Sequence, residues 1–195
     1  MLERISLHKS DNDKMLETTV KVANSGLVFH KMATDRFKMS RLSFNFILPA
    51  DPERSPCTKL MLSVMMRGCK KYPSVVKINK RLDSLYGATV GLRASRVGSK
   101  HVFRISCEML SNRYRFEGDS ESIVRSVAEV VLDILFDPLL DENGLLSASN
   151  FESEKTIALD AIRSKINDQK AYAAEQCGNL LFDGTDAGIS VRGTE

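Results

Sequence analysis

The sequence predicts an α+β fold in which helices pack on one face of an antiparallel sheet. The first observation is a pair of extended runs, 88–97 and 100–110, joined by Gly98-Ser99, a connection typical of a β-hairpin. The second is a set of segments whose apolar residues recur every three or four positions, as on one face of a helix. The order of these segments, hairpin, helix pair, hairpin and three helices, favours an antiparallel sheet. The 195 residues are enough for one domain with a sizeable core.

The first half of the chain predicts one hairpin and one helix pair. Residues 14–24 could form a short helix or remain loose. The elements that follow are a strand over 27–32, an alternating strand over 37–48 with a bulge near Ser40-Arg41, and helices from about 58 to Arg67-Gly68 and over 75–86. Residues 55–58 include candidate N-caps, and Gly68 suits the left-handed conformation that ends many helices. Pro73-Ser74 precedes the second helix and Gly87 closes it.

The second half predicts one hairpin and three helices. After the hairpin, a helix over 121–135 is preceded by capping residues 118–120 and stopped by Asp137-Pro138. A helix over 151–167 and a last helix over 171–181 follow. The apolar positions of the helix over 151–167 predict its buried face: Ile157, Ala158, Ala161, Ile162 and Ile166.

Composition excludes several classes of protein. The formal net charge of +3 is too small to predict nucleic-acid binding, and no run approaches the ~20 apolar residues of a membrane helix. The four cysteines match no zinc module, so we expect free thiols in a reducing compartment, with Cys107 in the core. With no signal-peptide pattern at the N-terminus, the expected location is cytoplasmic, without a membrane partner.

Two further features leave alternatives open. His30 and His101 lie on predicted strands and could meet as metal ligands, although strand histidines are more often surface groups or satisfied core groups. The densest group of cations follows the turn between the paired helices: Arg67, Lys70, Lys71, Lys77, Lys80 and Arg81. It is either a solvated helix face or a site for an acidic partner.

The helix pair from Thr58 to Gly87 resembles the one at the centre of the insulinase (pitrilysin) family of zinc peptidases. Further blocks in the same order strengthen the resemblance: 37–50, Leu82-Asp83-Ser84-Leu85-Tyr86-Gly87-Ala88, 137–140, 151–163, Asn167-Asp168 and 171–173. The bacterial subfamily whose members lack the zinc motif is the most similar. The resemblance implies an insulinase-family (LuxS/mitochondrial processing peptidase-like) half-domain. It also implies that residues 1–195 are one such half-domain and an N-terminal fragment of a longer chain with several half-domains.

The resemblance also shows what has happened to the metal site. Active members carry H-x-x-E-H on the first helix, where two histidines four residues apart bind Zn²⁺ and the glutamate activates water. Here the two histidine positions are Lys59 and Ser63, and the general-base position is Leu62. A lysine repels a cation and a leucine cannot take a proton, so we expect no intact metal site and no bound zinc. The third ligand position is Glu152 or its neighbour Glu154.

The strand after Gly87 corresponds to the family's edge strand, which pairs with the substrate backbone. The matching residues are Leu92, Arg93, Ala94, Ser95 and Arg96. The alternative is an ordinary edge strand that is protected from aggregation by Arg93 and Arg96.

The resemblance therefore predicts a catalytically silent subunit that binds a peptide or unfolded protein and pairs with a homologous, zinc-bearing peptidase. Two alternatives stay open. One is an active zinc metalloendopeptidase with unrecognised ligands. The other is an interaction module without a peptidase role that binds a partner through the basic helix pair.

Overall fold

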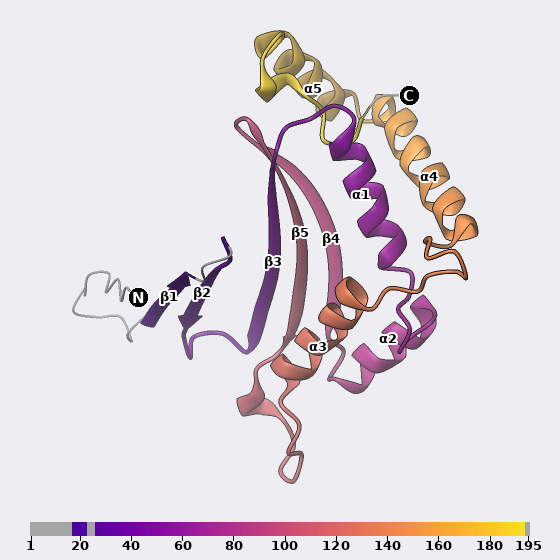
Figure 1. Cartoon of the computed structure of the whole chain (residues 1–195). Coiled ribbons are helices and arrows are strands. Elements are labelled where there is room, and N and C mark those ends of the chain that lie inside the picture. The colour runs from indigo at the N-terminus through magenta and orange to yellow at the C-terminus, as the bar shows by residue number, and fades with distance from the viewer. Residues whose placement is uncertain (1–16, 23–25, 194–195) are drawn as a thin grey trace, which may run out of the picture. The chain divides into compact units, whose positions relative to one another are not determined.

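The computed structural model describes residues 17–22 and 26–193, which belong to two compact units, Met1–Met39 and Ser40–Glu195. Each unit is described by itself. Figure 1 labels the main elements, which are, in chain order, β1 (Glu17–Val22), β2 (Val28–Ala33), β3 (Met39–Pro49), α1 (Arg54–Met65), α2 (Val75–Ser84), β4 (Thr89–Val97), β5 (Lys100–Leu110), α3 (Ile123–Phe136), α4 (Ala148–Arg163) and α5 (Gln169–Leu181).

The first unit is built on a hairpin. β1 pairs antiparallel with β2, from Glu17 opposite Ala33 to Val22 opposite Val28. The prediction of a short helix or loose chain was therefore wrong for residues 17–22, whose β-branched threonines and valines favour a strand. Residues 14–16, 23 and 24 of that prediction lie outside the described part of the chain. The predicted strand over 27–32 is confirmed as β2, shifted by one residue. The predicted hairpin between this strand and the strand over 37–48 was wrong, because β2 pairs with β1 and β3 pairs with β5.

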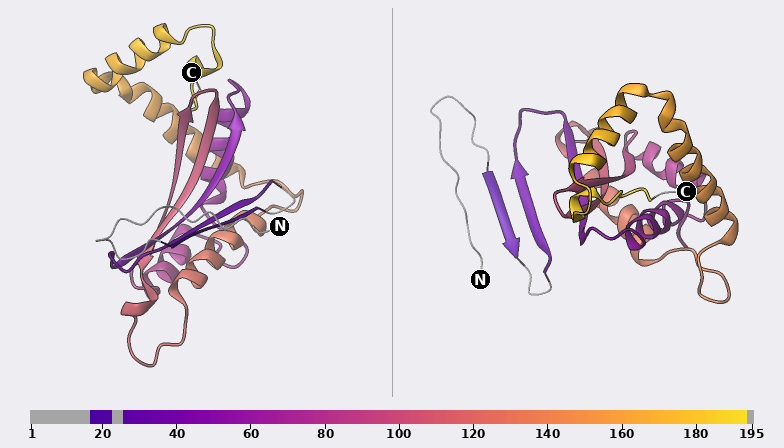
Figure 2. Two further views of the ribbon diagram at one scale, coloured as in Figure 1. Left: turned by 90° about the vertical axis from the view of Figure 1, so that its left-hand side faces the viewer. Right: turned by 90° about the horizontal axis from the view of Figure 1, so that it is seen from above.

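The second unit contains a three-stranded sheet in the order β3-β5-β4, so β5 is central and β4 is an edge strand of this sheet (Figures 1 and 2). β4 and β5 form the predicted hairpin, with Val97 opposite Lys100 across Gly98-Ser99. On the sheet face away from the core, Arg104 Nε donates to Asn45 Oδ1 (2.6 Å) and Arg41 pairs with Glu108 (2.5 Å). These two cross-strand contacts fix the register of β3 against β5.

The core lies between the other face of this sheet and the helices. Alternate residues of β5 are fully buried, Phe103, Ile105, Cys107 and Met109, whereas Arg104 is exposed. The apolar stripes of α2 and α3 cover these residues with Ile78, Leu82, Ile123, Val127, Val130, Val131 and Ile134. The α+β prediction, an antiparallel sheet with helices packed on one face, is confirmed.

The boundaries of α1 differ from the prediction at both ends. α1 starts at Arg54, so residues 55–58 lie inside the helix and do not cap it. Instead, the Asp51 carboxylate accepts hydrogen bonds from the amides of Glu53 (3.0 Å) and Arg54 (2.7 Å), and the bond from Arg54 lowers the Asp51 pKa. Gly68 does not adopt a left-handed conformation. Its role is steric, because a Cβ atom there would lie 3.0 Å from the carbonyl carbon of Pro73.

The helix α4 is less buried than predicted. α4 lies against α1, and α5 follows it through a short 3₁₀ turn, Ser164–Asn167 (Figure 1). Ala158 and Ile162 are half-buried, but Ile157 (52% exposed), Ala161 and Ile166 (62%) are exposed. The predicted buried face was therefore wrong at these three residues, because α4 contacts α1 along a narrower strip than its apolar pattern implied. Between residues 26 and 193, and in 17–22, no helix is long and apolar enough to cross a membrane.

Candidate functional site

The three residues that the family resemblance aligns with the zinc motif lie along α1. Lys59 and Ser63 are one helical turn apart and both are half-buried, whereas Leu62 is buried with 5% of its surface exposed. A primary ammonium group and a hydroxyl therefore stand at the two imidazole positions, and a core hydrocarbon stands at the general-base position. These residues do not fit a Zn²⁺ ion, which needs deprotonated nitrogen, sulfur or oxygen ligands.

The carboxylate that α4 presents near the end of α1 is Glu154. Arg67 Nε donates to Glu154 Oε1 at 2.5 Å, and the Glu154 side chain is only 15% exposed. Glu152 is 66% exposed and lies 3.9 Å from Lys155 of the same helix, so the structure does not pair it with Lys59. Helical periodicity could have indicated this choice, because Glu154 shares the face of the half-buried Ala158 and Ile162.

Lys59 stands in an unfavourable environment for its charge. Burial lowers the pKa of Lys59, the charges of Arg192 and Lys165 lower it further, and Glu154 opposes them. Within residues 26–193 no ion pair of Lys59 is formed at 4.0 Å or less. Positive charge therefore predominates around Lys59.

His101 has a structural role. It is fully buried on β5, with Nδ1 2.5 Å from Ser55 Oγ and Nε2 3.1 Å from the carbonyl oxygen of Ile189. Because a carbonyl only accepts, Nε2 carries the proton and Nδ1 accepts from the Ser55 hydroxyl. His30 is an exposed residue of β2 in the first unit. Among the described residues, no group of three or more His, Cys, Asp or Glu could hold a metal ion.

The predicted substrate strand is the edge strand β4. A two-residue hairpin loop is flanked by a hydrogen-bonded pair, here Val97 and Lys100, and the two pair types then alternate along the ladder. Leu92, Ala94 and Arg96 therefore belong to pairs not hydrogen-bonded to β5, and their backbone N–H and C=O groups point away from β5. Arg93, by contrast, lies opposite Arg104 and its backbone groups face β5.

A pocket of about 500 Å³ adjoins this edge. Ala94 and Arg96 of β4 line it together with Lys165, Tyr172 of α5, and Arg192. The Arg96 guanidinium lies 5.6 Å from the centre of the Phe182 ring, which draws the end of α5 toward the hairpin. No local sequence pattern predicts this pocket, because its walls come from segments more than 60 residues apart.

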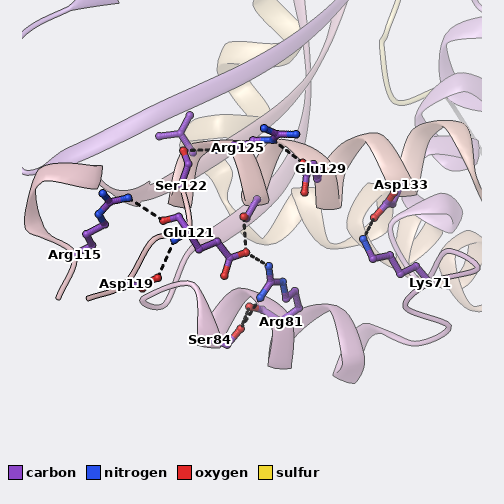
Figure 3. A network of polar contacts seen from close by, with 12 residues as sticks. Lys71, Arg81, Ser84, Arg115, Asp119, Glu121, Ser122, Arg125, Glu129 and Asp133 are labelled. Carbon is purple, nitrogen blue, oxygen red and sulfur yellow. Dashed lines mark hydrogen bonds and ion pairs between the residues drawn. The ribbon is translucent and has the colours of Figure 1, made fainter. Parts of the chain in front are cut away.

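The basic cluster of the helix pair is largely neutralised within the chain. Arg67 pairs with Glu154, Lys70 with Asp137 (2.6 Å), Lys71 with Asp133 (3.0 Å) and Arg81 with Glu121. Figure 3 shows the last two pairs, in which α3 and the segment before it supply the carboxylates. Only Lys77 and Lys80 of the six cations have no ion pair with a described residue, so the cluster mainly ties the helices together.

The cysteines follow the sequence prediction. All four are free thiols, with Cys57 and Cys177 exposed and Cys69 and Cys107 buried. Burial raises the pKa of Cys107 to about 11, so this thiol stays neutral at physiological pH.

Comparison with known proteins supports the resemblance. No family model matches the chain. The chain is 24% identical over 165 residues to a Bacillus subtilis (strain 168) protein named "Probable inactive metalloprotease YmfF", a match that covers 82% of this chain and 38% of that protein. A conserved protein from Enterococcus faecalis V583 has a similar structure, with a TM-score of 0.75, 27% identity, and coverage of 86% of this chain and 39% of that one. Pitrilysin matches with a TM-score of 0.59 and 15% identity, over 100% of this chain and 19% of its own.

The fold is thus that of a peptidase-like half-domain, the α+β unit shared with pitrilysin. In sequence the chain is similar to YmfF, and in fold it is similar to pitrilysin. It spans 38% of the length of the curated relative that it matches.

Proposed function

We propose that the chain is a catalytically silent, insulinase-family subunit that binds peptide along β4 and pairs with a homologue carrying the intact zinc motif. The observation that carries the proposal is the ion pair between Arg67 and Glu154, at 2.5 Å, on the side of α1 that bears the lost motif. A carboxylate held by a guanidinium is already neutralised, so it has little left to offer a metal ion. The relative's name, a probable inactive metalloprotease, supports the same conclusion.

The residues around this ion pair also disfavour metal binding. A zinc ion would face the ammonium of Lys59, with the charges of Arg192 and Lys165 acting on the same region. Leu62 offers no base to activate water, and it is part of the core. Three features therefore oppose hydrolysis: the absence of histidine ligands, the absence of a general base at Leu62, and the pairing of the Glu154 carboxylate with Arg67.

Peptide binding is supported by the geometry of β4. Leu92, Ala94 and Arg96 offer alternate outward N–H and C=O groups, the arrangement with which an extended peptide adds a strand to a sheet edge. The chamber of the insulinase family requires two facing halves, so a silent subunit has a physical task beside an active one. It completes the wall of the chamber and holds the substrate.

The test combines metal content, binding and hydrolysis on the same purified chain. We expect near-zero zinc after dialysis without chelator, and binding of an unfolded peptide without cleavage. Ala94→Pro removes one outward N–H at a position where an edge strand tolerates proline, and it should weaken binding by roughly five- to tenfold. Ala94→Ser is the matched control, because it keeps the backbone donor and should bind as the unchanged chain does.

Other outcomes would favour the alternatives. About one zinc per chain with peptide hydrolysis would replace the proposal by an active metalloendopeptidase. An interaction module would bind neither zinc nor peptide. It would instead bind an acidic protein tightly, and Lys77→Ala and Lys80→Ala would abolish that binding. Co-purification with a homologue bearing H-x-x-E-H would support the pairing, and a chain that binds peptide but never associates with such a homologue would contradict it.

A further inference from the structure

The segment after α5 is fixed against the start of α1. His101 joins the Ser55 side chain of α1 to the backbone of Ile189. A few residues later Gly193 lies so close to α1 that a Cβ atom there would be 2.8 Å from Pro56 Cγ. Arg192 is therefore held beside the first turn of α1, one turn before Lys59, and it lines the pocket next to β4.

The charges of this pocket do not balance. Glu175 is occupied by Lys165 (2.5 Å), and Asp168 uses its Oδ1 atom to accept from the Ala171 amide (3.0 Å) at the start of α5. Arg96 is stacked over Phe182, a contact that leaves its charge uncompensated. Among the described residues, Arg192 has no carboxylate partner. Three cations, Arg96, Lys165 and Arg192, thus line the pocket against two carboxylates, Asp168 and Glu175. Burial lowers the pKa of Lys59, and the charges of Arg192 and Lys165 lower it further.

We infer that this pocket binds the C-terminal carboxylate of a peptide whose preceding residues pair with β4. The inference rests on the proposed peptide-binding function and specifies its ligand. A carboxylate is the anion that a peptide carries at its end, and guanidinium groups bind it through parallel hydrogen bonds. Ala94 belongs both to the free edge of β4 and to the wall of the pocket. A peptide that pairs with β4 therefore extends into the pocket.

The pocket also limits the last residue of the ligand. Its volume is about 500 Å³, and its uncharged walls include Ala94, Ala171, Tyr172 and Val191. These side chains are small or apolar, and the uncharged polar groups of the lining belong to Tyr172, Asn179 and Ser190. A peptide ending in a medium-sized apolar residue fits this lining better than one ending in a charged residue.

The experiment compares one peptide as its free acid and as its C-terminal amide, by fluorescence anisotropy at fixed ionic strength. The free acid should bind at least tenfold more tightly, and Arg192→Gln should remove most of that preference without weakening the amide. Lys80→Gln, which removes one exposed positive charge outside the pocket lining, is the matched control and should keep the preference.

Each outcome has a distinct meaning. Equal binding of acid and amide would overturn the inference while leaving peptide binding along β4 intact, and a failure of both peptides to bind would overturn the proposed function itself. A further peptide ends in aspartate and has an amidated C-terminus, so its last carboxylate is on a side chain. If this peptide binds as tightly as the free acid, the assignment to the terminal carboxylate is overturned. A preference that survives both Arg192→Gln and Arg96→Gln would place the carboxylate elsewhere.

Discussion

Replacing His101 by phenylalanine tests how the segment 189–193 is held. The histidine is fully buried and satisfies two groups, the Ser55 hydroxyl (2.5 Å) and the Ile189 carbonyl (3.1 Å). Phenylalanine fills a similar volume but can bond neither group. Each buried polar group left without a partner costs about 1–3 kcal/mol, and the larger apolar ring offsets part of that cost. We expect His101→Phe to lower the free energy of unfolding by about 2–4 kcal/mol.

A second variant separates the lost hydrogen bonds from a change in packing. In Ser55→Ala/His101→Phe the hydroxyl is removed together with its partner, so one of the two penalties disappears. The double variant should recover about 1–2 kcal/mol relative to His101→Phe. Urea unfolding followed by circular dichroism measures both values, provided that the transition is two-state. A loss below about 0.5 kcal/mol for His101→Phe, or no recovery in the double variant, would refute the assigned hydrogen bonds.

Three further predictions follow from local geometry. Gly68→Ala should lower the free energy of unfolding by about 1–3 kcal/mol, because the added Cβ atom would lie 3.0 Å from the carbonyl carbon of Pro73. The control is Gly91→Ala, where the added Cβ atom meets open space. This control should be neutral or slightly stabilising in the same unfolding assay. A thiol reagent at pH 8 should label two cysteines in the native chain and four after denaturation, since Cys107 has a pKa of about 11; native labelling of Cys107 would contradict its burial. Lys59→Met should stabilise the chain by about 1 kcal/mol at pH 7. The stability gained by Lys59→Met should shrink as the pH rises through the lowered pKa of Lys59, because the lysine of the unchanged chain then loses its unfavourable charge in the folded state. A stability gain that grows with pH would show that the folded state does not disfavour this charge.

The sequence predicted most reliably the elements whose ends are set by local chemistry. Gly98-Ser99 fixed the hairpin, Ser74 caps α2 by accepting from the Lys77 amide (3.4 Å), and Asp137-Pro138 follows α3. It failed where a more distant group decides the outcome. The Asp51 carboxylate starts α1 ahead of the serine and threonine residues that looked like caps.

The candidate site likewise has features that follow from local sequence and features that depend on distant residues. The identities at Lys59, Leu62 and Ser63 exclude a zinc ligand set without any coordinates. The Arg67–Glu154 pair and the bond from His101 to Ile189 each join residues almost 90 positions apart, and no local pattern predicts such contacts. The charge of the pocket depends on contacts between segments that are distant in the sequence, so the sequence alone does not predict it.

The surroundings of α1 would oppose a zinc site engineered at the positions that the resemblance indicates. Restoring histidines at 59 and 63 would still leave Leu62, whose buried position would force a new glutamate into the core without a partner. It would also leave Glu154 bound to Arg67 at 2.5 Å, so the third ligand would have to break an ion pair before it could reach a metal. Removing Arg67 would in turn leave Glu154 largely buried and unpaired until the metal arrived. Each single substitution toward the zinc motif would therefore cost stability unless the others accompanied it.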